Sequence, residues 1–217
     1  MRSKWIMAAA GIIACTATTN LYAQGGGIAL IPFAGYGIPG TLAEDDQGNS
    51  FKVNPAMVLG VQLELGLSKN LGIDVGINRS FSQTFDLEGP TLGTGEEDIS
   101  MMQVTGSLVI RPAGRRPNGA VTPLMFELGG GVTMYSFGSA AAGFDEFDST
   151  RPMFFAGAGY NVPIGPRGTL QFFARGQMIT AYESSGLDDF NAIPPATNIE
   201  GKSMLNIQAG VGFRFGR

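Results

Sequence analysis

The sequence contains no histidine and only one cysteine among its 217 residues. Without histidine, the chain cannot build a Ser-His-Asp or Cys-His catalytic centre, a histidine-ligated metal site or an imidazole pH sensor. The cysteine, Cys15, lies near the N-terminus and has no partner for a disulfide. These absences exclude the commonest hydrolase mechanisms and any disulfide-framed secreted domain.

Charged residues are also scarce, at 15% of the chain, where about 25% is average. The formal net charge is −4, which excludes the basic face that a nucleic-acid partner would need. Glycine is abundant instead, with 33 residues, roughly twice the average usage. The hydrophobic fraction of 44% is too low for a bundle of membrane helices and too high for a disordered chain. A soluble globular domain or a β protein in a membrane remains.

The N-terminal segment, residues 1–23, is typical of a secretory signal peptide. Two basic residues precede an apolar run at 5–15, and a polar stretch then ends at Ala23. This run is too short for a spanning helix, which needs about 20 apolar residues. We therefore predict cleavage after Ala23 and a single mature domain over 24–217. A second processing route stays open, because the residues up to Cys15 resemble the lipobox of bacterial lipoproteins, in which the cysteine is lipidated.

Beyond the leader, apolar and polar side chains alternate with a period of two, which is typical of strands and not of helices. The alternation is cleanest over 59–68 and 205–215. No run reaches the roughly 18 consecutive apolar residues of a membrane helix. The pattern predicts eight strands, at 27–38, 56–67, 71–83, 101–111, 123–137, 153–164, 169–182 and 203–215.

The connections between these strands alternate in length. Those at 68–70, 112–122 and 165–168 are short or of medium length, whereas those at 39–55, 84–100, 138–152 and 183–202 are long. Of the 18 acidic residues, only Glu64, Asp74 and Glu127 fall within the predicted strands, and the others lie in the long loops. Short turns at one end and long loops at the other are typical of bacterial outer-membrane barrels. We therefore predict an all-β fold, an eight-stranded antiparallel up-and-down transmembrane β-barrel.

Alternation alone does not tell which face of a barrel points inward, so a soluble lipocalin-like barrel is the alternative. A soluble barrel would crowd its polar face with Lys and Glu. Here the polar face carries mostly Gly, Ser, Asn and Gln, which suit a narrow lumen. We therefore expect the apolar side chains to face lipid, with aromatic residues such as Tyr36, Tyr160 and Phe215 at the membrane interfaces.

Two segments carry a resemblance to a known family: LELGLSKNLGIDVGI at 63–77 and the closing NIQAGVGFRF at 206–215. Together with the signal peptide, they resemble the small outer-membrane β-barrel domain proteins of the OmpA/OmpX type, over essentially the whole mature chain. The resemblance implies a bacterial outer-membrane location and a final aromatic residue read by the barrel-assembly machinery. Phe213 and Phe215 are the candidates for this signal, although two further residues follow them.

Six charged residues occupy polar positions of the predicted strands: Glu64, Asp74, Arg111, Glu127, Arg175 and Arg214. The interior of an eight-stranded barrel is just wide enough for side chains to fill it. Charges buried there must pair. We predict an internal salt-bridge network, with Glu127 or Glu64 against Arg175 or Arg214, that closes the lumen. The alternative is a set of separately hydrated charges lining a narrow water path.

The sequence predicts no enzyme, metal site or cofactor. Hydrolases of the family it resembles generally rely on histidine, and loop carboxylate pairs such as Glu96 with Glu97 lie in wet loops unsuited to acid–base catalysis. No acidic cluster has the spacing of a known calcium loop. The expected partners are outer-membrane lipid and lipopolysaccharide, the barrel-assembly machinery and an extracellular partner at the acidic loops. We predict a monomer with a structural or surface-interaction role; the alternative is a porin-like narrow channel or solute-binding barrel.

Overall fold

The computed structural model describes residues 27–44, 48, 50–89, 93–113, 123–137, 147–164, 168–181 and 200–216. The predicted signal peptide, its cleavage site at Ala23 and the alternative lipidation site at Cys15 lie outside the described residues. No helix among the described residues is long and apolar enough to cross a membrane.

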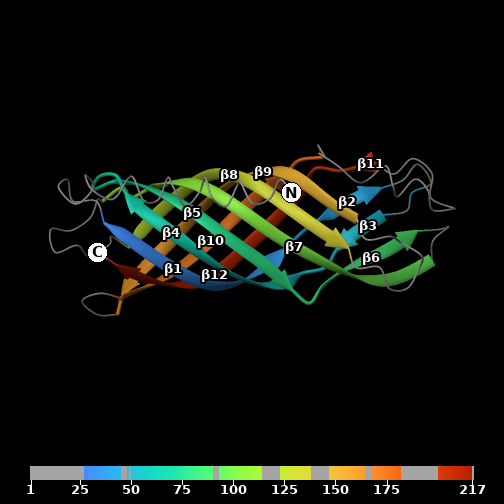
Figure 1. Cartoon of the computed structure of the whole chain (residues 1–217), viewed down its shortest axis with the longest axis horizontal. Helices are drawn as coiled ribbons and strands as arrows, with labels where there is room; N and C mark the ends of the chain where they lie inside the picture. The colour runs from blue at the N-terminus through green and yellow to red at the C-terminus, as the bar shows by residue number, and fades with distance from the viewer. Residues whose placement is uncertain are drawn as a thin grey trace, which may run out of the picture.

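Eight long antiparallel strands close into a barrel (Figure 1). They are β1 (Ile28–Ile38), β4 (Ala56–Gly66), β5 (Leu71–Phe81), β7 (Gly93–Ile110), β8 (Leu124–Phe137), β9 (Phe147–Pro163), β10 (Gly168–Ile179) and β12 (Met204–Gly216). Each of these strands pairs with the next one along the chain, and the pairing of β1 with β12 completes the ring. The predicted eight-stranded antiparallel up-and-down barrel is confirmed.

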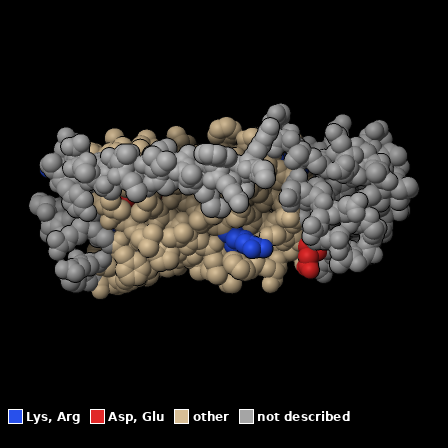
Figure 2. Space-filling model, viewed as in Figure 1, with Lys and Arg blue, Asp and Glu red and all other residues tan. Residues whose placement is uncertain are grey.

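The two faces of the barrel wall differ in chemistry because side chains alternate along each strand. Apolar side chains point outward, and Leu128 and Phe154 are each 63% exposed. Polar side chains such as Gln62, Gln103 and Gln177 point inward and are buried. The described part of the wall in Figure 2 is accordingly almost free of charge. This arrangement is that of a transmembrane barrel, and the lipocalin-like alternative is wrong.

Glycines in the wall make room for aromatic rings inside the lumen. Phe33 of β1 lies opposite Gly60 of β4, and Phe155 of β9 lies opposite Gly129 of β8. A Cβ atom on Gly60 would lie 2.5 Å from Cζ of Phe33, and one on Gly129 would lie 2.6 Å from Cζ of Phe155. The close approach of the rings therefore requires glycine at both positions.

The sheet extends beyond the barrel into segments that the sequence predicts to be long loops. The extension contains β2 (Thr41–Glu44), β3 (Ser50–Val53), β6 (Gln83–Gly89) and β11 (Glu200–Gly201), in the order β11-β2-β3-β6 against the first part of β7. Figure 1 shows β2, β3 and β6 at one end of the molecule. The prediction of loops is wrong here because β6 pairs with β7 and each further strand pairs with the one before it. Strand propensity depends strongly on such context.

The wall of the barrel has a kink where β5 ends. β5 ends at Phe81, two residues before its predicted end, and Ser82 has a φ of 50°, in the left-handed region. β5 pairs with β7 up to Arg79, whereas β6 begins at Gln83 and pairs with the preceding part of β7. Ser82 therefore separates the barrel from its extension.

Candidate functional site

The six charged residues predicted to face the lumen all lie inside it. Glu64, Asp74, Arg111, Glu127, Arg175 and Arg214 are each at most 3% exposed. Five come from β4, β5, β8, β10 and β12, and Arg111 directly follows β7. Alternation within each strand accounts for their inward direction. The register between neighbouring strands around the ring determines which acidic residue pairs with which arginine.

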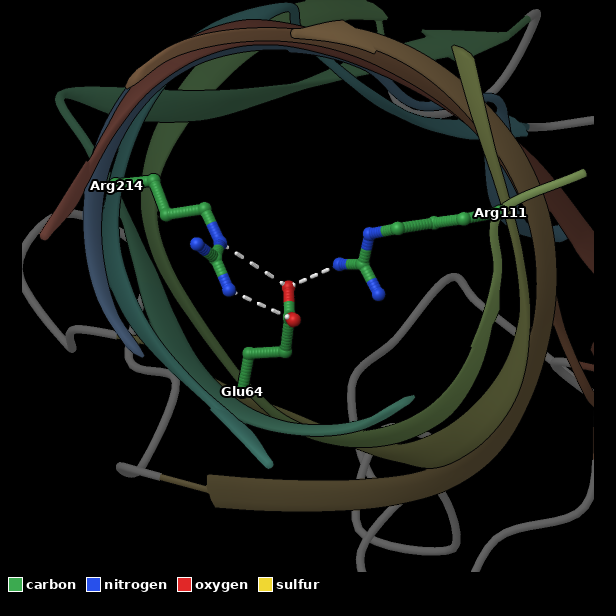
Figure 3. Close-up of polar contacts among 3 residues, drawn as sticks. All are labelled: Glu64, Arg111 and Arg214. Atoms are coloured by element: carbon green, nitrogen blue, oxygen red, sulfur yellow. Dashed lines mark hydrogen bonds and ion pairs between the residues drawn. The ribbon is translucent and has the colours of Figure 1, made fainter. Parts of the chain in front are cut away.

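Glu64 joins two arginines that reach it from opposite sides of the lumen (Figure 3). Arg214 donates from Nη2 to Oε1 at 2.9 Å and from Nε to Oε2 at 3.4 Å. Arg111 donates from its own Nη2 to Oε2 of the same carboxylate. All three residues lie near the short-turn ends of their strands. One carboxylate between two guanidinium groups leaves a local surplus of positive charge.

Asp74 lies directly opposite Glu64 in the pairing of β4 with β5. Both of its carboxylate oxygens are buried and accept no hydrogen bond within the described part of the chain. Like charges directly across a strand pair repel each other, and the arginines bound to Glu64 reduce this repulsion. Asp74 therefore belongs to this cluster by its position beside Glu64, not through a hydrogen bond.

Arg175 forms the centre of a second cluster. Its Nε donates to Glu127 Oε2 at 2.8 Å. With its amide oxygen turned toward the guanidinium group, Gln62 accepts hydrogen bonds from Nη1 at 3.1 Å and from Nη2. The guanidinium carbon lies 4.7 Å from the ring centre of Phe173 and 5.5 Å from that of Phe155. A carboxylate, an amide and aromatic faces thus enclose the cation, an arrangement that stabilises a desolvated arginine.

Amide side chains form a third layer toward the long-loop end. Oε1 of Gln177 accepts hydrogen bonds from Nδ2 of Asn206 at 2.7 Å and from Nε2 of Gln103 at 3.0 Å. Nε2 of Gln177 donates to Oε1 of Gln208 at 2.9 Å. Each amide carries both donors and acceptors, so these side chains can bind one another across β7, β10 and β12.

Arg151 of β9 is a buried charge that the sequence analysis missed. Its Nη1 donates to the backbone oxygens of Leu42 at 3.1 Å and Lys202 at 3.2 Å. Arg151 thereby ties β2 and the segment after β11 to the long-loop end of the lumen. The predicted strand starts at 153, whereas β9 starts at Phe147. Continuing the alternation by one more pair of residues would have placed Arg151 inward.

The two candidates for the assembly signal, Phe213 and Phe215, lie on the outward face of β12. Their ring centres are 4.2 Å apart. Phe213 covers Gly168 of β10, where a Cβ atom would lie 2.8 Å from its Cζ. Phe215 is 51% exposed. The Phe215 ring is therefore available to lipid or to a binding partner, and its role as an assembly signal stays a prediction.

Acidic side chains form no candidate metal centre in the part of the chain that the structure describes. Seven of the loop acids lie outside that part: Asp45, Asp46, Asp145, Glu146, Glu183, Asp188 and Asp189. Glu44 of β2 forms an exposed ion pair with Lys202. In the described barrel, charged side chains are therefore concentrated in the lumen clusters around Glu64 and Arg175.

Comparisons with known proteins bear on the fold. No protein-family model matches the sequence, and no curated protein matches it. Among solved structures, the chain is similar to the outer membrane protein OprG from Pseudomonas aeruginosa, with a TM-score of 0.57 at 14% identity, over 89% of this chain and 97% of that one. It is also similar to the outer membrane protein AlkL, with a TM-score of 0.50 at 15% identity, over 89% of this chain and 90% of that one. At these identities the likeness shows a shared transmembrane barrel fold.

Proposed function

We propose that this chain is an integral outer-membrane protein with a closed lumen and a structural role, presenting its acidic long-loop end to a partner outside the cell. The observation that supports the proposal is the set of paired side chains that point into the interior. Ion pairs, aromatic rings and amides from strands around the ring lie in the interior, where a channel would need open space. An eight-stranded barrel is just wide enough for such a filling.

The three layers follow one another along the barrel axis. Gln62 and Glu64 are successive inward positions on β4, and Arg175 and Gln177 are successive inward positions on β10. The Arg175 cluster therefore lies between the Glu64 cluster and the amides. Leaving a buried charge without its partner costs about 3–5 kcal/mol, which corresponds to an open population of roughly 10⁻² to 10⁻⁴ at about 1.4 kcal/mol per factor of ten. A solute would have to displace every layer.

The same contacts support a non-enzymatic role. Glu64 and Glu127 are held by arginines deep in the lumen, not aimed at a cleft where a substrate could bind. General acid–base catalysis needs a group within hydrogen-bond reach of the reacting proton. A filled lumen gives a substrate no such access.

Planar-bilayer conductance tests the closed lumen. We expect the refolded wild-type protein to show no stable open channel. Arg214→Ala removes one of the two guanidinium groups at Glu64 and should raise the conductance. Arg79→Gln is the matched control, because Arg79 lies on the outward face of β5 and its loss should leave the conductance unchanged. A stable open pore in the wild type would contradict the proposal and favour the narrow-channel alternative.

A further inference from the structure

A pocket of about 620 Å³ opens in the barrel wall beside the kink at the end of β5. Its lining includes a basic side chain, an acidic one and several hydroxyl groups: Arg79, Asp98, Ser82, Ser100 and Ser136. Arg79, Asp98, Ser82 and Ser136 are exposed on the outward face. The pocket is therefore accessible from outside the barrel, and buried side chains of Ser80, Gln83 and Ile99 also line it.

Arg79 interrupts an apolar row on the outward face of β5. The outward positions before it are Ile73, Val75 and Ile77, whose side chains are 38–48% exposed. Arg79 donates from Nε to Oγ of Ser100 at 3.2 Å. No ion pair joins Arg79 to another described residue, although Asp98 lines the same pocket. Its two Nη groups are therefore left to bind a ligand.

The depth of Arg79 in the membrane follows from strand geometry. Arg79 lies eight residues after Leu71, the short-turn end of β5, which is about 26 Å along a strand at about 3.3 Å per residue. At a tilt of about 40°, the rise along the barrel axis is about 20 Å. The apolar band of such barrels is about 25 Å tall. Arg79 thus lies near the boundary of the band at the long-loop end, where lipid head groups begin.

We propose that this pocket binds a phosphate group of lipopolysaccharide in the outer leaflet. Arginine presents a planar fork of donors that matches phosphate and binds it in a bidentate manner. The hydroxyl groups of Ser82, Ser100 and Ser136 supply neutral donors around it. Lipopolysaccharide is the phosphate-bearing lipid of the leaflet at the long-loop end. The inference rests on the proposed outer-membrane location and adds a lipid site to it.

Titration of the purified, folded protein with lipopolysaccharide tests the proposal, with bound lipid counted by native mass spectrometry. We expect Arg79→Gln to weaken binding at least tenfold, since it removes the charge-assisted hydrogen bonds. Asp98→Asn should strengthen binding because it removes a carboxylate from the pocket. Lys52→Gln is the matched control: it removes an exposed charge from β3, outside the pocket, and should leave binding unchanged.

Three further ligands identify the source of the phosphate. Lipopolysaccharide stripped of its phosphates should bind the wild type as weakly as intact lipopolysaccharide binds Arg79→Gln. Inorganic phosphate should compete with intact lipopolysaccharide only at much higher concentration. Equal binding of phosphatidylglycerol would overturn the assignment to lipopolysaccharide. Unchanged binding by Arg79→Gln, with wild-type heat-modifiable migration on a gel, would overturn the site. Either result leaves the closed barrel intact, whereas failure of the wild type to insert into membranes would overturn the proposed function itself.

Discussion

The ion pair between Glu127 and Arg175 provides the sharpest test of lumen energetics. Glu127→Gln keeps the size of the side chain but removes its charge, which leaves the Arg175 guanidinium buried with Gln62 and aromatic rings. Removing one partner of a buried pair costs about 3–5 kcal/mol. We expect a loss of about 3 kcal/mol, at the low end of this range, because Gln62 and the rings still contact the cation. Arg175→Met should cost more, since it leaves Glu127 without its donor.

The double variant Glu127→Gln/Arg175→Met separates the interaction energy of the pair from the contacts that each side chain makes with its surroundings. Both single changes break the same contact, so the double variant should lose less than the sum, with a coupling energy of about 2–3 kcal/mol. Denaturant unfolding in lipid vesicles, followed by circular dichroism and heat-modifiable gel migration, measures these values. Tryptophan fluorescence is unsuitable because the one tryptophan, Trp5, lies in the predicted signal peptide. Lys69→Gln, at an exposed turn, is the control and should change stability by less than about 0.5 kcal/mol. A loss below 0.5 kcal/mol in Glu127→Gln, or strict additivity, would refute the reasoning.

Three other changes test separate parts of the structure. Arg151→Met should speed amide hydrogen exchange in β2, measured by mass spectrometry, while the barrel strands keep their protection; unchanged exchange in β2 would show that this tether is dispensable. Gly129→Ala should destabilise the barrel by about 1–3 kcal/mol through overpacking. Gly176→Ala should be tolerated, because a Cβ atom there would have no neighbour within 4 Å. Equal losses of stability in the two variants would contradict the packing argument. Phe215→Ala should lower the amount of assembled barrel in cells without lowering the stability of refolded protein, and a larger assembly defect in Phe213→Ala would assign the signal to Phe213 instead.

The barrel itself was predictable because a membrane barrel imposes a strict rule on its strands. Lipid outside and a packed polar lumen inside require opposite side-chain character at successive residues. The segment at 59–68 shows this rule plainly, and the observed β4 matches its predicted strand to within one residue. The same parity placed Glu64 and Arg214 in the lumen.

The extension at the long-loop end was not predictable in the same way. β2 and β3 are only four residues long, and their neighbours in the sheet come from distant parts of the chain. Such short strands leave too few residues for a clear alternation. Arg151 was missed for the related reason that β9 begins earlier than the apolar pattern indicates.

The pairing inside the lumen depends on register, which sequence patterns do not specify. The alternation of polar and apolar residues predicts that Glu64 and Asp74 both face inward. It does not predict that they lie directly opposite each other. It also does not tell that Arg111 and Arg214 both bind Glu64, so that Asp74 has no hydrogen bond in the described structure. These details follow from the offset between strands around the closed ring.

The central claim is that apolar side chains face lipid while the polar lumen excludes water, and accessibility along β8 tests it most directly. Residues 24–217 contain no native cysteine, so single cysteines introduced into this segment at Met125, Leu128, Val132 and Thr133 can each carry a spin label in lipid vesicles. We expect high oxygen and low nickel-complex accessibility at the outward positions Leu128 and Val132, and low accessibility to both reagents at the inward positions Met125 and Thr133. High nickel-complex accessibility at the inward positions would reveal a water-filled channel. High nickel-complex accessibility at the outward positions would reveal a soluble barrel. Either result would contradict the account.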